Sequence, residues 1–188
     1  MKLSTKMALR NNFLRKIEVY LRILSKKNKY RERNILRTIT FGKGADIGCG
    51  SNKVNSNCIG VDLFGKQERG IAGCEKGKSS VADYKSAGDN LSMFKNNELD
   101  FIVAKHNLEH YDSPLKTLLE WKRVIKKGGK IGVVVPDDRY VNSSNLDPTH
   151  RYSFSPKTLH YLFKHAGLKI IKEGIAIKHW SIYLIAEK

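Results

Sequence analysis

Cysteine is scarce in this chain of 188 residues, and long apolar stretches are missing. The three cysteines form no Cys-x-x-Cys pair and cannot all be joined in disulfides, which disfavours a zinc site and indicates a reducing compartment. No apolar run approaches the roughly 18 residues that cross a bilayer, and the N-terminus lacks the apolar core of a secretory signal. We therefore expect a cytoplasmic protein without a metal site.

Acidic residues are also few, because 18 Asp and Glu stand against 35 Lys and Arg, a net charge of +17. The excess is concentrated in residues 1–43, which hold 13 basic and 2 acidic residues. Apolar side chains recur there at helical spacing, at Leu9, Phe13, Ile17, Leu21 and Leu24. We predict a basic helical extension over residues 1–43 and one domain over residues 44–188. The extension is interpreted as a helix pair covering one face of a sheet, with docking on a membrane surface or a polyanion as the alternative.

Beyond residue 43, short apolar runs alternate with helical patterns. This alternation predicts an α/β fold with a mostly parallel sheet and right-handed crossovers. The last two strands are only a few residues apart, so we expect a hairpin that makes the last strand antiparallel. Strands are predicted near residues 44–48, 58–62, 79–83, 99–105, 130–136, 168–175 and 179–187. Helices are predicted near residues 112–127 and 155–166, with shorter pieces around 87–94 and a second N-terminal stretch at Ile35, Leu36 and Ile39.

The first crossover is unusually short. Only the eight residues from Ser51 to Cys58 separate Gly50 from the second strand. A crossover that contains a helix needs a dozen or more residues, so this one should be a loop. The loop leaves one sheet face undercovered, and we expect the apolar stripe of the N-terminal helix to fill that gap.

The most informative motif is Asp46-Ile47-Gly48-Cys49-Gly50, which ends the first strand. Glycine lets the backbone turn sharply and approach a ligand closely. The second strand ends at Asp62, where a carboxylate can accept both hydroxyls of a ribose, and ligands of open α/β sheets bind beyond the carboxyl ends of the strands. The pattern lacks the third glycine of the dinucleotide fingerprint and the Gly-Lys-Ser/Thr of a phosphate loop. Asp46, the acid before the glycines, would repel a pyrophosphate but suits a nucleoside-type cofactor that carries a cationic amino-acid end.

These segments resemble the motifs of class I S-adenosylmethionine-dependent methyltransferases, in the type 11 branch associated with cell-surface glycan gene clusters. The likeness is carried, in the family's order, by residues 46–50, 60–63, 80–84, 99–110 and 124–136. Asp147-Pro148-Thr149-His150, followed by Phe154-Ser155-Pro156, is similar to a motif of the same branch. The resemblance covers residues 42–188. It implies a Rossmann-like seven-stranded sheet and S-adenosylmethionine as the cofactor.

The resemblance also implies roles for single residues. Asp62 would bind the ribose, and Asp83 with Tyr84 would meet the adenine. His106 is a candidate general base because imidazole titrates near neutral pH, and His150 is expected to orient the acceptor or to act as the base. The alternative for each of these residues is a purely structural role, in a turn, at the end of a strand or in closing a loop. The cofactor-binding residues implied are Asp46, Gly48, Cys49, Gly50, Asp62, Leu63, Asp83, Tyr84, Lys105, His106 and Asn107.

The function predicted on this basis is methyl transfer to a small polar acceptor, a sugar or a glycan or glycolipid precursor. The long polar connection over residues 135–151 suits such an acceptor, since loops at this sheet edge commonly carry function. One alternative is an RNA or protein methyltransferase that uses the basic arm, although nucleic acid is the less expected partner because no Asn-Pro-Pro-Tyr motif occurs. Another is a non-catalytic subunit that binds the cofactor. Peripheral membrane association through the arm is a further expectation, and the sequence leaves the oligomeric state open.

Overall fold

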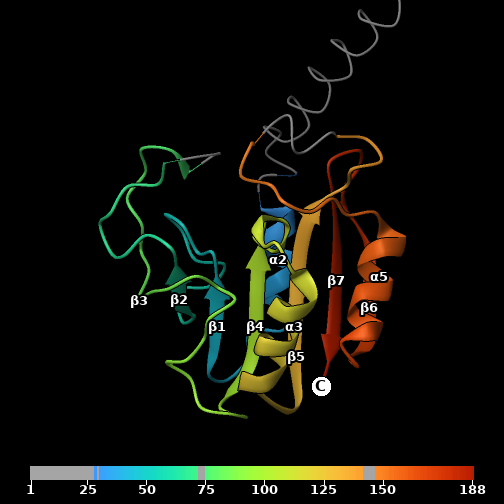
Figure 1. Ribbon diagram of the computed structural model, residues 1–188, viewed down its shortest axis with the longest axis horizontal. Helices are drawn as coiled ribbons and strands as arrows, with labels where there is room; N and C mark the ends of the chain where they lie inside the picture. The colour runs from blue at the N-terminus through green and yellow to red at the C-terminus, as the bar shows by residue number, and fades with distance from the viewer. Residues whose placement is uncertain (1–27, 29, 72–74, 142–146) are drawn as a thin grey trace, which may run out of the picture.

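A computed structural model describes residues 28, 30–71, 75–141 and 147–188 of the chain. Its centre is one seven-stranded sheet in the order β3-β2-β1-β4-β5-β7-β6 (Figure 1). The strands are β1 (Gly44–Ile47), β2 (Ile59–Asp62), β3 (Tyr84–Lys85), β4 (Leu99–Lys105), β5 (Ile125–Pro136), β6 (Lys169–Ile177) and β7 (Ser181–Glu187). The order steps outward from β1 in both directions, which is the doubly wound arrangement with its ligand crevice beside the first strand.

Only β7 runs against its neighbours, because it pairs antiparallel with both β5 and β6 while the other pairs are parallel. The expected mostly parallel sheet with an antiparallel last strand is therefore confirmed. Ile47 lies opposite Val61 on one side and Ala104 on the other. The carboxyl ends of β1, β2 and β4 are thus level, and they form one edge of the sheet.

Helices cover both faces of the sheet (Figure 1). On one face lie α3 (Pro114–Val124) and α5 (Pro156–His165), whose Trp121 and Phe163 are buried in the larger hydrophobic core. On the other face α2 (Arg31–Arg37) contributes Leu36 to a second core. Among the helices of the described ranges, none combines the length and apolarity needed to cross a membrane.

The first crossover is a loop without a helix, as predicted. The loop is held to the end of β1 by one hydrogen bond, which the backbone N–H of Val54 donates to the buried carboxylate of Asp46. Val54 and Cys58 pack against Leu36 of α2 and against Ile39 in the second core. The gap left by the missing helix is therefore filled by α2. The predicted stripe from Leu9 to Leu24 lies outside the described residues.

Two local predictions were wrong. The strand expected at residues 79–83 is displaced to Tyr84–Lys85, and both of its residues are exposed at the sheet edge. Residues 87–94 form turns instead of short helices. They are fixed by partners on α3, because Glu120 accepts from the Leu91 N–H at 2.9 Å and the Trp121 indole donates to the Gly88 carbonyl at 2.7 Å. Tertiary hydrogen bonds thus override a weak local helical pattern.

Candidate functional site

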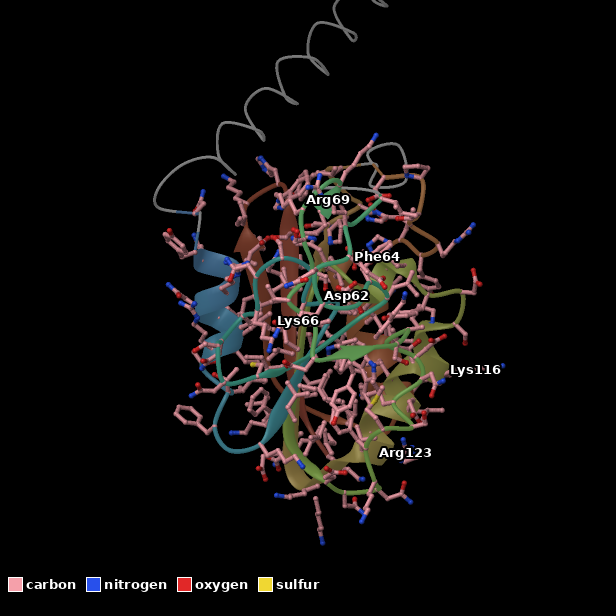
Figure 2. All side chains as sticks on the ribbon, turned by 90° about the vertical axis from the view of Figure 1, so that its left-hand side faces the viewer. Asp62, Phe64, Lys66, Arg69, Lys116 and Arg123 are labelled. Atoms are coloured by element: carbon pink, nitrogen blue, oxygen red, sulfur yellow. The ribbon has the colours of Figure 1, made fainter. Side chains whose placement is uncertain are left out.

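A cavity of about 780 Å³ opens at the carboxyl ends of β1, β2 and β4. This volume lies within the range of about 300–1,000 Å³ usual for small-molecule sites. Figure 2 views the molecule from the β3 side and shows Asp62 beside Phe64, two residues of the cavity wall. Of the predicted site residues, the cavity is lined by Gly48, Gly50, Asp62, Leu63, His106, Asn107 and His150.

The two glycines after β1 form the floor of this cavity. Gly48 and Gly50 have φ angles of 70° and 53°, the left-handed region that side chains disfavour. A Cβ atom on Gly48 would lie 2.2 Å from the Asn107 side-chain nitrogen. The close approach of the β1 turn to the end of β4 therefore requires glycine at position 48.

Asp62 ends β2 with its carboxylate facing the cavity. One oxygen accepts from the Gly50 N–H at 2.8 Å, and the other accepts from the Phe64 N–H at 3.0 Å. An ionised carboxylate has about four lone-pair positions, so each oxygen can still accept one more hydrogen bond. Asp62 is thus held in place by the backbone and keeps two acceptor positions, which matches the two hydroxyls of a ribose.

Asp83 and Tyr84 are not brought to the cavity, although the family motif suggested both. The Asp83 carboxylate accepts from the Gly60 N–H at 2.7 Å and pairs with the Lys53 ammonium. The Tyr84 ring packs edge-on against Phe94 with centroids 5.8 Å apart. Both residues therefore anchor the β2–β3 side of the sheet.

Asp46, Cys49 and Lys105 are not among the residues that line the cavity. Asp46 is 2% exposed, and this burial raises the pKa of its carboxyl to about 7. The Cys49 thiol is buried as well, and desolvation raises its pKa. Asp46 holds the crossover loop, so its support of the site is indirect.

A wall that the sequence did not indicate is formed by residues 86–89 together with Tyr111. The Tyr111 hydroxyl donates to Asn107 Oδ1 at 2.7 Å, and a Cβ atom on Gly88 would lie 2.2 Å from that hydroxyl oxygen. This turn adjoins the end of β2, since the Ser86 N–H donates to the Asp62 carbonyl at 2.8 Å, and it lines the cavity where Asp83 does not. Its Ala87-Gly88-Asp89 sequence offers only turn chemistry, which is too common to mark a site.

His106 follows β4 and has a φ of 52°, an uncommon backbone conformation for a residue other than glycine. Its Nε2 lies 3.1 Å from the carboxylate of Glu32 on α2, and that carboxylate also accepts from the Ser181 hydroxyl at 2.5 Å. Burial alone would lower the pKa of His106, yet the charge of Glu32 and the neighbouring carboxylate of Glu109 raise it to about 9. Burial would likewise raise the pKa of Glu32, but the charge of His106 lowers it to about 2. At neutral pH His106 is an imidazolium and therefore has no lone pair to accept a proton.

His150 lies near the same Glu109 carboxylate as His106, but its electrostatic setting is different. Burial lowers the pKa of its imidazole, and this effect outweighs the opposing charge of Glu109. Its Nε2 is 3.9 Å from a Glu109 oxygen, and its ring meets the His110 ring edge-on with centroids 4.6 Å apart. The backbone joins these segments, because the N–H groups of Arg151 and Tyr152 donate to the Glu109 carbonyl. His150 is thus a neutral imidazole on the cavity wall.

Comparison with known proteins agrees with this geometry. A sequence model of a family described as a methyltransferase domain matches residues 15–173. An uncharacterized protein of Methanocaldococcus jannaschii is 31% identical over 147 residues, which cover 72% of this chain and 69% of that protein. The fold is similar to a Thermotoga maritima S-adenosylmethionine-dependent methyltransferase, described as a possible histamine N-methyltransferase (TM-score 0.63, 20% identity, 95% of this chain and 99% of that one). It is also similar to an S-adenosylmethionine-dependent methyltransferase of Archaeoglobus fulgidus (TM-score 0.57, 21% identity, 84% and 94% covered).

Proposed function

We propose that this chain, which belongs to the methyltransferase domain family, methylates a small polar acceptor, with a hydroxyl of a sugar or of a glycan precursor as the first candidate. The cofactor is S-adenosylmethionine. The proposal is supported mainly by one observation. The same cavity is lined by Gly48, Gly50 and Asp62 and by the neutral imidazole of His150.

The residues at the carboxyl ends of β1 and β2 are suited to bind the cofactor. Asp62 keeps two acceptor positions for ribose hydroxyls, and the turn at Gly48 and Gly50 brings bare backbone to the cavity. When bound, S-adenosylmethionine supplies an electrophilic methyl group. The chain's own task is to hold donor and acceptor in line, an effect of proximity that contributes several kcal/mol.

The opposite side of the cavity fits a polar acceptor. It is lined by Asp112, Asp147, Thr149, His150 and Arg151. His150 is neutral near pH 7 and can contact the acceptor oxygen, whereas His106 is held as a cation by Glu32. The protonated state of His106 supports His150 as the residue that faces the acceptor.

A polymeric acceptor remains the competing hypothesis. Its support is the basic character of residues 1–43, through which RNA or an anionic membrane could be held. Most of that extension lies outside the described residues, and the volume of the cavity suits a small acceptor. Docking of the arm on a membrane surface would suit a glycolipid precursor.

Two measurements test the function. Calorimetric titration with S-adenosylmethionine and S-adenosylhomocysteine should show one site per chain. Transfer of a labelled methyl group should then be screened over sugar nucleotides, glycolipids and RNA. Transfer to RNA alone would move the proposal to the polymeric acceptor, and cofactor binding without transfer to any class would indicate the non-catalytic subunit.

A further inference from the structure

We propose that Glu109, His110 and His150 form a binding site for one divalent transition-metal cation, with Zn²⁺ as the first candidate, at the acceptor side of the cavity. The cysteine pattern had led us to expect no metal site, and these three residues come from two distant segments of the chain. The site goes beyond methyl transfer, since binding of the cation does not depend on it.

The fold gathers the three side chains in one place. One ligand atom from each lies within 4.8 Å of the ligand atoms of the other two. His150 Nε2 and Glu109 Oε1 are 3.9 Å apart. Bonds of about 2.0–2.1 Å to a tetrahedral Zn²⁺ place ligand atoms about 3.3 Å from one another, so modest side-chain rotation would complete the site.

The environment of the Glu109 carboxylate supports a bound ligand at this position. Glu109 is fully buried, and neither carboxylate oxygen has a hydrogen-bond donor within the described part of the chain. The His106 imidazolium forms an ion pair with Glu109, with its Nδ1 3.6 Å from Oε1, but both carboxylate oxygens still lack a hydrogen bond from any described residue. A buried carboxylate normally has hydrogen bonds or a metal as well as a charged neighbour, and a cation at this point would satisfy Glu109.

A second layer of hydrogen bonds orients His110. The Thr149 hydroxyl donates to the Asp147 carboxylate at 2.6 Å, and the same oxygen lies 3.0 Å from His110 Nδ1. Because the hydroxyl proton is already used, this oxygen accepts from the Nδ1–H of His110. The lone pair is thereby left on Nε2. Metal-binding histidines are commonly fixed in this way by a partner on their other nitrogen.

The ligand set also decides the chemistry of the cation. Two imidazoles and one carboxylate suit Zn²⁺, Mn²⁺, Fe²⁺ or Co²⁺, and disfavour Mg²⁺ and Ca²⁺, which prefer oxygen ligands only. Three protein ligands leave a coordination position open, as in catalytic zinc sites. All three residues line the cavity, so an acceptor oxygen could take that position. With the cation bound, His150 is a ligand, and the cation makes the contact with the acceptor.

The test is direct binding to the full chain after removal of metals with a chelator. Zn²⁺ is titrated calorimetrically, and Co²⁺ is followed by its visible absorption. We expect one equivalent to bind. Glu109→Gln, His110→Ala and His150→Ala should each abolish the high-affinity phase, and Thr149→Val should weaken it by about 10–100-fold, as is typical for loss of an outer partner.

His160→Ala is the matched control. His160 is exposed and also contacts a carboxylate, with Nδ1 3.0 Å from Glu173, but it lies on α5 and not in the cavity wall. This variant should bind Zn²⁺ like the unmodified chain. Absence of a stoichiometric site, or equal affinity in the Glu109, His110 and His150 variants, would overturn the proposal.

Thr149→Val is included because loss of one surface hydroxyl leaves the core intact, so its result stands even if Glu109→Gln fails to fold. Cofactor titration on the same samples separates the two proposals. A chain that binds Zn²⁺ through these residues but not S-adenosylmethionine would refute the assignment of the cofactor site and support the metal site.

Discussion

Replacing Glu32 with glutamine should change how the stability of this protein depends on pH. The Glu32 carboxylate on α2 lies 3.1 Å from the imidazolium of His106, and the pair is partly buried between α2 and the end of β4. Glutamine keeps the size of the side chain and a hydrogen-bonding group but removes the charge. His106 then loses its closest counter-ion, so we expect its pKa to fall well below about 9.

The magnitude follows from the two pKa values. His106 titrates at about 9 in the folded chain and near 6.5 when unfolded, so its stabilisation is complete below pH 6.5 and is lost as the pH rises through 9. Glu32 titrates at about 2 when folded and 4.5 when unfolded, so its stabilisation is present above pH 4.5 and is lost as the pH falls through 2. Both contributions are complete between pH 4.5 and 6.5. At about 1.4 kcal/mol per pH unit, the unmodified chain should lose up to about 3 kcal/mol between pH 6.5 and 9.

The assay is urea unfolding of both proteins at intervals from pH 5.5 to 9.5, with the His106 resonance followed by NMR. The advantage of the unmodified chain over Glu32→Gln should be largest near pH 6 and should shrink towards pH 9. Glu173→Gln is the control, because it breaks an exposed His–Glu pair with His160, of the kind worth about 0–1 kcal/mol. A stability difference that is constant over this range, or equal in the control, would refute the coupling of Glu32 to His106.

Three further predictions concern the cofactor site and the arm. Asp62→Asn should lower the affinity for S-adenosylmethionine about 10–100-fold, measured by calorimetry, because it weakens two charge-assisted hydrogen bonds to the ribose. Asp83→Asn is the control and should leave the affinity unchanged. Equal losses of affinity in the two variants would show that Asp62 is not the ribose ligand. Gly48→Ala should lower the free energy of unfolding by at least about 1–2 kcal/mol, because its backbone is left-handed and its Cβ would meet Asn107, and unchanged stability would contradict that geometry. Deleting residues 1–27 should lower the melting temperature; unchanged melting with loss of binding to anionic vesicles would identify the arm as a docking device.

Local sequence signals predicted most of the fold. The helix near residues 155–166 begins with Ser155 as N-cap and Pro156 in its first turn, and Ser155 and Thr158 form a reciprocal capping box. The helix near residues 112–127 likewise starts at Pro114 after Ser113. Such signals act within one turn, so they can be read without tertiary information. The turn glycines and Asp62 were recognisable for the same reason, because strand, turn and acid follow one another in the chain.

The rest of the site depends on contacts between distant segments. Glu32 and Ser181 are 149 residues apart, yet their hydrogen bond helps to set the charge of His106. No local pattern marks such a pair, and His106 was therefore predicted as a base when the fold makes it a cation. Asp83 has the sequence context of an adenine ligand, but the nearby ammonium of Lys53 and the Gly60 N–H occupy its carboxylate. Competing partners of this kind become visible only after folding.

The charges around His106 and Glu109 depend on α2, which the sequence assigned to an extension outside the domain. His106 forms one ion pair with Glu32 through Nε2 and a second with Glu109 through Nδ1, so one imidazolium faces two carboxylates. Glu109 lies 3.6 Å from His106 and 3.9 Å from His150. Two carboxylates and one imidazolium meet at this part of the cavity wall, an arrangement that supports the proposed cation site. Glu32 of α2 thus sets the charge of a cavity residue, His106, although it lies outside the predicted domain of residues 44–188.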